Sequence, residues 1–193
     1  FIAKPFSKEE LICRINNTIE AMENINKIAN FANRDFLTGA YNRRYFYQDI
    51  EEYVQTAEEL DEPYAFAMLD IDHFKKINDT YGHDGGDKIL KSLAKILIDN
   101  TKGRDVVARF GGEEFCVVLK KIAKEEAIKF FVNLRAKVAE NEVIIKDKTI
   151  KVTVSIGVSF GKGHCEIDDM LEACDSALYV AKENGRNRVE IAL

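Results

Sequence analysis

The chain has 193 residues, of which 46% are hydrophobic and 32% charged, with a formal net charge of −5. This length suits one domain with a substantial core plus a modest extension. The acidic balance argues against a general nucleic-acid binder, which needs concentrated positive charge. No apolar stretch is long enough to span a bilayer and no signal peptide opens the chain, so we expect a cytoplasmic protein without a membrane segment. The four cysteines form no CxxC pair and no zinc spacing, which indicates reduced thiols.

The first 34 residues carry a helical pattern. Apolar residues recur at three- and four-residue steps, at Leu11, Ile15, Ile19, Met22, Ile25, Ile28 and Ala32. This spacing predicts one helix from about Lys8 to about Asn33. Because the apolar stripe is narrow, we expect the helix to pair with another helix rather than to cover a globular core. We therefore interpret residues 1–34 as a connector and residues 35–193 as a separate domain.

After Asp35 the pattern changes to alternating strands and helices. We expect helices at Arg43–Leu60, Asp84–Asp99, Lys124–Asn141 and Ile167–Asn184, and strands at Tyr64–Ile71, Val106–Ala108, Phe115–Leu119, within Lys148–Phe160 and at Val189–Ala192. The polar and glycine-rich stretch from Phe74 to Asp87 is expected to be a loop. Strands separated by helices, with one hairpin among them, predict an α+β sheet covered by helices, of ferredoxin-like type.

The turn Gly111-Gly112-Glu113-Glu114-Phe115 lies between the two apolar runs of the expected hairpin. Two adjacent glycines allow a tight turn and leave room for a bulky ligand. The two carboxylates stand at the tip, where a hairpin does not need them. They point to a divalent cation and a phosphate-bearing ligand, although the same residues also make an ordinary exposed hairpin.

A second acidic pair, Asp70 and Asp72, follows the apolar run that begins at Tyr64. A carboxylate at the end of a buried strand is costly unless it is paired or bound to a metal. Residues two apart on a strand share a face, so the two side chains are expected to point the same way. For Asp72, capping of the next turn is an equally good interpretation. For Asp70 together with the Glu113-Glu114 turn, a Mg²⁺ site is the better one.

Four motifs in this order resemble those of the GGDEF family of diguanylate cyclases. They are Asp35–Arg44 (with Ala40 where Leu is usual), Asp70–Leu90, Arg109–Phe115 (with Glu113 where Asp is usual) and Lys182–Arg188. The resemblance covers residues 35–193 and implies a nucleotidyl-cyclase-like fold. It also implies that two GTP molecules condense to cyclic di-GMP with release of two pyrophosphates, across a homodimer in which each copy holds one nucleotide.

The resemblance also assigns roles to single residues. Mg²⁺, or Mn²⁺ in its place, is held by Asp70, the main-chain carbonyl of Ile71 and Glu113. Glu114 completes a second metal site or helps to ionise the attacking hydroxyl. Guanine is read by Asn78 and Asp87, and phosphates by His73, Phe74, Lys75, Lys182 and Arg186. From the residues alone, Asp87 is also a candidate helix N-cap, and the two cations near the last helix end also suit its dipole.

Many family members carry an inhibitory product site, Arg-x-x-Asp, before the hairpin turn. Here the stretch is Lys102-Gly103-Arg104-Asp105. Lys102 keeps the positive charge but lacks the planar fork of arginine. We therefore predict weak or absent product inhibition through this degenerate site, formed by Lys102 and Asp105.

The first fifteen residues also resemble part of a known domain. Lys4-Pro5-Phe6 and the helix start at Glu10–Ile15 resemble the end of a response-regulator receiver domain, which implies a regulatory domain upstream. Three alternatives to the cyclase stay open. They are a silent module that binds GTP or cyclic di-GMP, a dimerising relay, and a cyclase that makes a mononucleotide ring.

Overall fold

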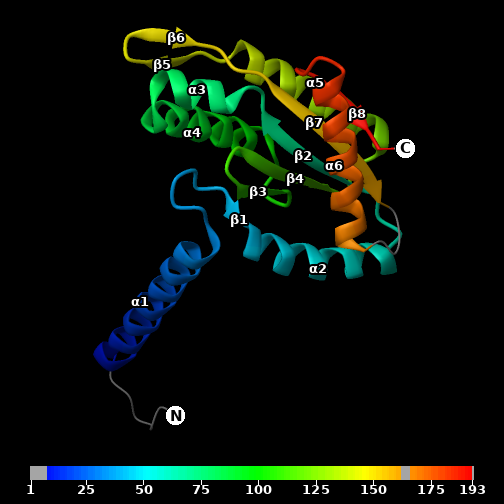
Figure 1. Ribbon diagram of the computed structural model, residues 1–193. Coiled ribbons are helices and arrows are strands. Elements are labelled where there is room, and N and C mark those ends of the chain that lie inside the picture. Colours follow the sequence, from blue (N-terminus) through cyan, green and yellow to red (C-terminus); the bar gives the residue numbers. More distant parts are fainter. Residues whose placement is uncertain (1–7, 162–165, 193) are drawn as a thin grey trace. The chain divides into compact units, whose positions relative to one another are not determined.

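A computed structural model describes residues 8–161 and 166–192, without the side chains of residues 23–31 and 58 (Figure 1). The chain divides by its internal contacts into two compact units, with the boundary between Arg34 and Asp35. The first unit is the helix α1 (Lys8–Asn33). The Lys4-Pro5-Phe6 stretch lies outside the described residues. None of the helices in the described part of the chain is long and apolar enough to cross a membrane.

The second unit is built on a mixed six-stranded sheet in the order β1-β3-β4-β2-β7-β8. Its strands are β1 (Tyr41–Asn42), β2 (Tyr64–Ile71), β3 (Val106–Gly111), β4 (Glu114–Lys120), β7 (Val154–Gly161) and β8 (Val189–Ile191). The four central strands, β3-β4-β2-β7, are antiparallel throughout, as in a ferredoxin-like sheet. A separate ribbon pairs β5 (Val143–Ile145) with β6 (Lys148–Ile150).

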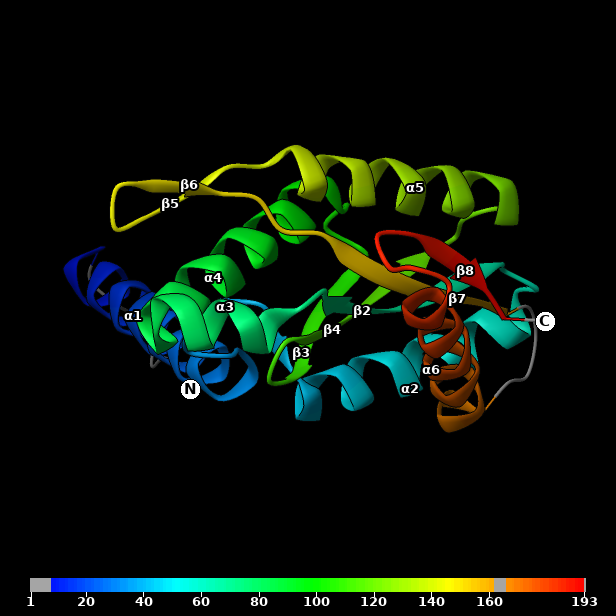
Figure 2. The ribbon, with the colours of Figure 1, turned by 45° about the horizontal axis from the view of Figure 1, so that its top comes forward.

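Helices cover both faces of this sheet (Figure 2). They are α2 (Arg43–Glu59), α3 (Phe74–Tyr81), α4 (His83–Asn100), α5 (Lys124–Glu140) and α6 (Ile167–Glu183). One hydrophobic core lies under α4 and α5, around side chains such as Leu93 and Phe131. A second lies under α2 and α6, around Phe46 and Leu178. The α+β class, with a sheet covered by helices, is thus confirmed.

The central strand β2 brings the acidic residue Asp70 to one end of the sheet. All eight residues of β2 are buried, because β4 and β7 flank its edges and helices cover both faces. A strand buried on both faces has a continuous apolar sequence, which Tyr64–Leu69 provides. Asp70 comes directly after this run, so the polar end of β2 emerges beside the β3–β4 turn.

One expected element was wrong. The stretch after β2 was expected to be a loop, but Phe74–Tyr81 forms the helix α3. Its polar residues lie largely outside, while Phe74 is buried against the core under α4. The short strands β1 and β5 were not expected either, since two or three residues give no usable period. The remaining expected helices and the main strands agree with the structure to within a few residues.

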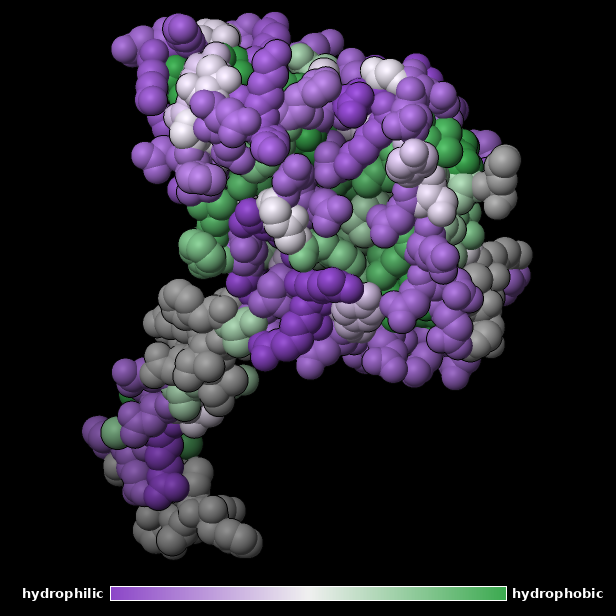
Figure 3. All heavy atoms as spheres, in the orientation of Figure 1, coloured by the Kyte–Doolittle hydropathy of each residue, from purple (hydrophilic) through white to green (hydrophobic). Residues whose placement is uncertain are grey.

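Exposed hydrophobic side chains form a row along the first part of α1. Ile12, Ile15, Ile19 and Met22 are each about half exposed or more along α1. In the second unit, hydrophilic side chains cover much of the visible face, with hydrophobic groups showing between them (Figure 3). Along residues 8–22, where the side chains are described, the apolar stripe of α1 is therefore largely exposed.

Candidate active site

The turn between β3 and β4 is shaped by one arginine. Gly111 pairs with Glu114, which leaves Gly112 and Glu113 at the tip, and Gly112 has a left-handed φ of 48°. Arg109 donates from Nε and Nη2 to the carbonyl oxygen of Gly112, at 3.1 and 2.7 Å. Its Nη1 also donates to Asp35 at 3.1 Å. The guanidinium thus fixes the turn from within, as a bidentate fork can.

Asp35 completes this arrangement from the beginning of the second unit. Its carboxylate accepts hydrogen bonds from the main-chain N–H and the hydroxyl of Thr38, at 2.9 and 2.6 Å. Burial alone would raise the pKa of Asp35, but the Thr38 hydrogen bonds and the charge of Arg109 outweigh it and lower the pKa. Asp35, the first residue of the first sequence motif, therefore supports the turn.

Asp70 sits opposite Glu114, because β2 and β4 pair these two residues in register. Asp70 is 7% exposed, and its Oδ2 lies 2.9 Å from Nζ of Lys182, in the last turn of α6. The ammonium supplies the positive charge that a buried carboxylate requires. Three residues far apart in the chain therefore meet at the ends of β2, β4 and α6.

The pKa values of the two carboxyls report this crowding. Burial raises the pKa of Asp70, and Asp72 adds to this effect, while Lys182 and Arg186 oppose it. Burial also raises the pKa of Glu114, reinforced by Asp70, Asp175 and Glu113. The site thus gathers more negative charge than its lysine offsets, which favours a cationic ligand.

On the other side of β2, α3 and α4 hold the residues expected to read a base. His73 has a left-handed φ of 59° and precedes the first turn of α3, where main-chain N–H groups of Phe74 and Lys75 lie. Asn78 projects from α3 toward Gly86 of α4: a Cβ on Gly86 would lie 2.0 Å from Oδ1 of Asn78. Glycine is therefore needed there for the two helices to approach.

Asp87 follows Gly86 and stands beside the same contact. Because α4 begins at His83 and its N-cap is Gly82, Asp87 lies inside the helix. The alternative interpretation of Asp87 as the helix N-cap is therefore wrong. A half-buried carboxylate inside α4, next to the Asn78 contact, is placed to accept hydrogen bonds from a ligand.

Comparisons with known proteins agree with this geometry. The sequence pattern described as "Diguanylate cyclase, GGDEF domain" matches residues 32–188. The chain belongs to the GGDEF family. It is 38% identical over 173 residues to diguanylate cyclase A of Treponema denticola, covering 88% of this chain and 47% of that protein. It is 33% identical over 198 residues to the response regulator PleD of Caulobacter vibrioides, covering 97% of this chain and 44% of PleD.

A solved structure shows the same fold. The coiled coil and GGDEF domain of DgcB from Caulobacter crescentus, in complex with c-di-GMP, is 28% identical, with a TM-score of 0.85 over 96% of this chain and 98% of that one. The chain spans less than half the length of the two curated relatives named above. The family and the fold are thereby shown for this GGDEF domain.

The residues of this GGDEF domain fit a magnesium ion. Across residues 8–161 and 166–192, no three His, Cys, Asp or Glu side chains gather closely enough to hold a metal by themselves. Mg²⁺ in nucleotide sites usually takes only one or two carboxylates, with substrate phosphates and waters as the other ligands. Asp70, already buried beside a cationic group, is such a carboxylate, and Glu113 and the Ile71 carbonyl remain the further oxygens that the sequence motifs predict.

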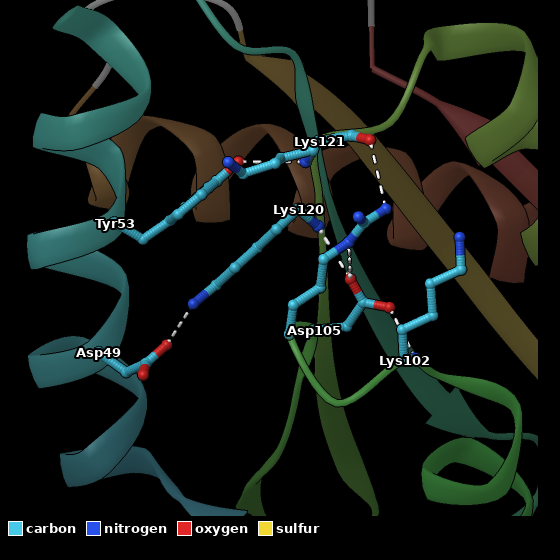
Figure 4. Close-up of polar contacts among 7 residues, drawn as sticks. Asp49, Tyr53, Lys102, Asp105, Lys120 and Lys121 are labelled. Atoms are coloured by element: carbon cyan, nitrogen blue, oxygen red, sulfur yellow. Dashed lines mark hydrogen bonds and ion pairs between the residues drawn. The ribbon is translucent and has the colours of Figure 1, made fainter. Parts of the chain in front are cut away.

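At the stretch predicted to be a degenerate inhibitory site, the carboxylate of Asp105 is engaged by the protein's own main chain (Figure 4). Asp105 Oδ2 accepts from the main-chain N–H of Lys102 at 2.8 Å, and Oδ1 from that of Lys120 at 3.1 Å. The side chain of Asp105 is nearly buried, whereas Lys102 is exposed. Asp105 therefore closes its own turn and ties it to the end of β4.

Sequence reasoning missed a hollow beside Glu114, between α2 and α6. It has a volume of about 320 Å³, and its walls include Arg43, Tyr47, Phe110, Glu114 and Asp175. Burial raises the pKa of Asp175, against the charges of Lys182 and Arg43. Asp175 lies two helical turns ahead of the motif that begins at Lys182, so its helical spacing from Lys182 was the available signal.

Proposed function

We propose that this GGDEF domain is a diguanylate cyclase, which condenses two GTP into cyclic di-GMP with release of two pyrophosphates. The main support for this proposal is that Asp70, Glu114 and Lys182 come together at one end of the sheet. Diguanylate cyclase A, a 38% identical relative, bears the name of this activity, and DgcB binds the product in its solved structure. Because GTP is a cytosolic nucleotide, we place the activity in the cytoplasm.

The nucleotide would lie across the end of β2. Asn78 and Asp87 would face guanine, whose N1–H and 2-amino group both donate to a carboxylate. Adenine lacks this donor pair and would leave Asp87 unsatisfied, which is a strong means of discrimination. This argues against an adenylyl-type cyclase that makes a mononucleotide ring. Main-chain N–H groups at His73 and Phe74, with Lys75, would receive the phosphates, as helix starts do.

Charge at the reacting end would come from the two sides of β2. Asp70, the Ile71 carbonyl and Glu113 would hold Mg²⁺, or Mn²⁺, which neutralises charge on the triphosphate and the leaving pyrophosphate when bound. Lys182 would leave Asp70 for the phosphates, since both are anions within its reach. Glu114, whose pKa burial raises, is suited to accept a proton from the attacking hydroxyl or to bind a second ion.

The reaction requires two copies, because each domain would hold one GTP. Ile12, Ile15, Ile19 and Met22 of α1 recur at three- and four-residue steps and are exposed, which is the pattern of a coiled-coil seam. The DgcB structure named above includes a coiled coil next to its GGDEF domain. We infer that α1 raises the local concentration of partner domains and thereby supports the homodimer.

We also propose that the domain is the output domain of a response regulator. The support is the receiver-like sequence from Lys4 to Ile15 and the similarity over 97% of this chain to PleD, which is named a response regulator. Phosphorylation of an upstream receiver would then change how two α1 helices associate.

The decisive experiment incubates the purified chain with GTP and Mg²⁺ and identifies the products by mass spectrometry. We expect cyclic di-GMP and pyrophosphate, and no turnover after chelation until Mg²⁺ or Mn²⁺ is restored. Glu113→Gln and Glu114→Gln should each lower the initial rate by about 100-fold or more, because both remove charge where the metal and the reacting groups are held.

Glu140→Gln, an exposed acid at the end of α5, is the matched control and should leave the rate unchanged. A chain that binds GTP with Mg²⁺ but makes no cyclic product at any protein concentration would support the silent binding module instead. If the chain forms a dimer but binds no nucleotide, the dimerising relay would be the only one of these interpretations left.

A further inference from the structure

The loop after α6 holds an unfavourable backbone conformation. Gly185, Arg186 and Asn187 have successive positive φ values of 106°, 63° and 47°. Two adjacent non-glycine residues in the left-handed region are uncommon, because their side chains crowd the backbone there. Such a conformation persists only where surrounding contacts impose it. The contacts that impose it are therefore informative about what the loop does.

The first contact comes from Asp72, just after β2. Its Oδ2 accepts from the main-chain N–H of Asn187 at 3.0 Å and from the hydroxyl of Thr153 at 2.6 Å. Its Oδ1 accepts from the hydroxyl of Ser155 at 2.7 Å. Asp72 is only 5% exposed, so these three donors satisfy a buried carboxylate. The start of β7 and the loop after α6 are thus fastened to one side chain.

The second contact comes from Arg135 on α5. Its Nη1 donates to the main-chain oxygen of Asn187 at 3.0 Å and to Oδ1 of the same residue at 2.8 Å. Asn187 is therefore held on its N–H by Asp72 and on both its oxygens by Arg135. The main chain on either side is fixed as well, since Arg186 N–H donates to Ala181 and Ile156 N–H donates to Arg188.

The residue between these fixed points is Arg186. It is half-buried, and its neighbour Asn187 contacts Asp72, two residues after Asp70, so the loop lies at the same end of β2 as Lys182, which contacts Asp70. A residue with left-handed φ sends its side chain in a direction different from that of a helical residue. The direction of Arg186 thus depends on the conformation that Asp72 and Arg135 impose on its neighbour.

We infer that Asp72 and Arg135 are positioning residues that aim Arg186 at the nucleotide polyphosphate. This inference rests on the proposed function, because Arg186 is a phosphate ligand only if GTP binds there. It goes beyond that function in two respects. Arg135 lies on α5, outside all four motifs, and Asp72 acts through the loop rather than on the metal.

The test compares steady-state kinetics of Arg135→Ala and the unaltered chain, with thermal unfolding measured on both. Arg135→Ala should raise the KM for GTP by about 3- to 10-fold and change kcat less than about twofold, because it loosens a binding group without touching the reacting groups. The melting temperature should move little, since the contact is exposed. Lys129→Ala, an exposed cation on the same helix, is the control and should change none of these values.

A double-mutant cycle separates positioning from a general structural role. If Arg135 acts through Arg186, adding Arg135→Ala to Arg186→Ala should raise KM no further. Equal effects of Arg135→Ala in both backgrounds would overturn the inference, as would an unchanged KM in the single variant. If either result is found while the unaltered chain still converts GTP, only the positioning inference fails and the proposed function stands. If the unaltered chain neither binds nor converts GTP, both the inference and the proposed function fail.

Two substitutions of Asp72 provide a second test of the inference. Asparagine is isosteric and its amide oxygen can still accept the Asn187 N–H, so Asp72→Asn should keep KM within about threefold of wild type. Asp72→Ala leaves three donors without their acceptor and should raise KM at least as much as Arg135→Ala. If Asp72→Ala does not fold, the Arg135 cycle still decides the matter.

Discussion

At the residue scale, Asp105 shows how the contacts of a side chain decide its role. The resemblance to the GGDEF family marks it as half of a degenerate inhibitory site. In the structure both oxygens are engaged by main-chain N–H groups, of Lys102 and Lys120, within the protein. A carboxylate already satisfied in this way gains little from binding a ligand and costs stability when it is removed.

We therefore predict that Asp105→Ala lowers the free energy of unfolding by about 1–3 kcal/mol, because two main-chain donors lose their acceptor. Asp105→Asn, which keeps one acceptor, should cost less. Denaturant titration measures both. Inhibition of the initial rate by added cyclic di-GMP should be weak in the unaltered chain and remain so in both variants. Tight product binding that disappears in Asp105→Ala would contradict the prediction.

The residue types of the site could be predicted from the sequence, but their pairings could not. The motifs single out Asp70, Glu113, Glu114, Lys182 and Arg186 as candidates. Nothing local indicates that Asp70 pairs with Lys182, or that Asp72 binds a loop 115 residues further along the chain. Both pairings arise from the order of strands in the sheet, which sets β2 beside β7 and under α6.

At the scale of elements, α3 shows the same limit. Its sequence is polar and ends before a glycine, which indicates a loop when read alone. It is a helix because Phe74 enters the core and because Gly85 and Gly86 let α4 come close. The close packing of α3 against α4 therefore stabilises α3 as a helix and fixes where Asn78 lies.

We expect Gly86→Ala to disturb this position directly. The added Cβ would lie 2.0 Å from Oδ1 of Asn78 and 3.1 Å from Cζ of Phe74, so the carboxamide must move. Because Oδ1 is the free end of a side chain, this movement costs little stability, and the higher helix propensity of alanine offsets part of the cost. The KM for GTP should rise by roughly tenfold, which corresponds to about 1.4 kcal/mol of lost binding.

Gly103→Ala is the matched control, because a Cβ there meets nothing within 4 Å. It should leave both the melting temperature and the KM unchanged. A Gly86→Ala variant with normal KM for GTP would show that Asn78 has no part in reading the nucleotide.

At the scale of the whole molecule, the two units differ in how they bury apolar residues. The second unit packs many of its apolar residues into two cores and leaves several large ones exposed, whereas residues 8–22 of α1 expose a row of them. An isolated helix of this kind has little reason to stay folded by itself, since most helical stability in proteins comes from packing an apolar face. Association of two α1 helices would supply that packing.

We predict that the rate per copy of the chain rises with protein concentration. Ile15→Lys combined with Ile19→Lys should shift this rise to higher concentration by about tenfold or more, because charges at a coiled-coil seam oppose pairing. Asn17→Lys, on the same helix, is the control. Rate against concentration, with sedimentation of each variant, provides the measurement. A rate per copy that is constant over a wide dilution range would exclude the requirement for two copies.

The salt bridge of Asp35 has a geometric consequence for how such a molecule is controlled. Asp35 stands two residues after the last residue of α1 and is held by Arg109, whose guanidinium also grips the carbonyl of Gly112. The polypeptide thus enters the second unit at a point already fastened to the glycine turn. A displacement of the main chain at this boundary would reach the turn through two side chains, those of Asp35 and Arg109.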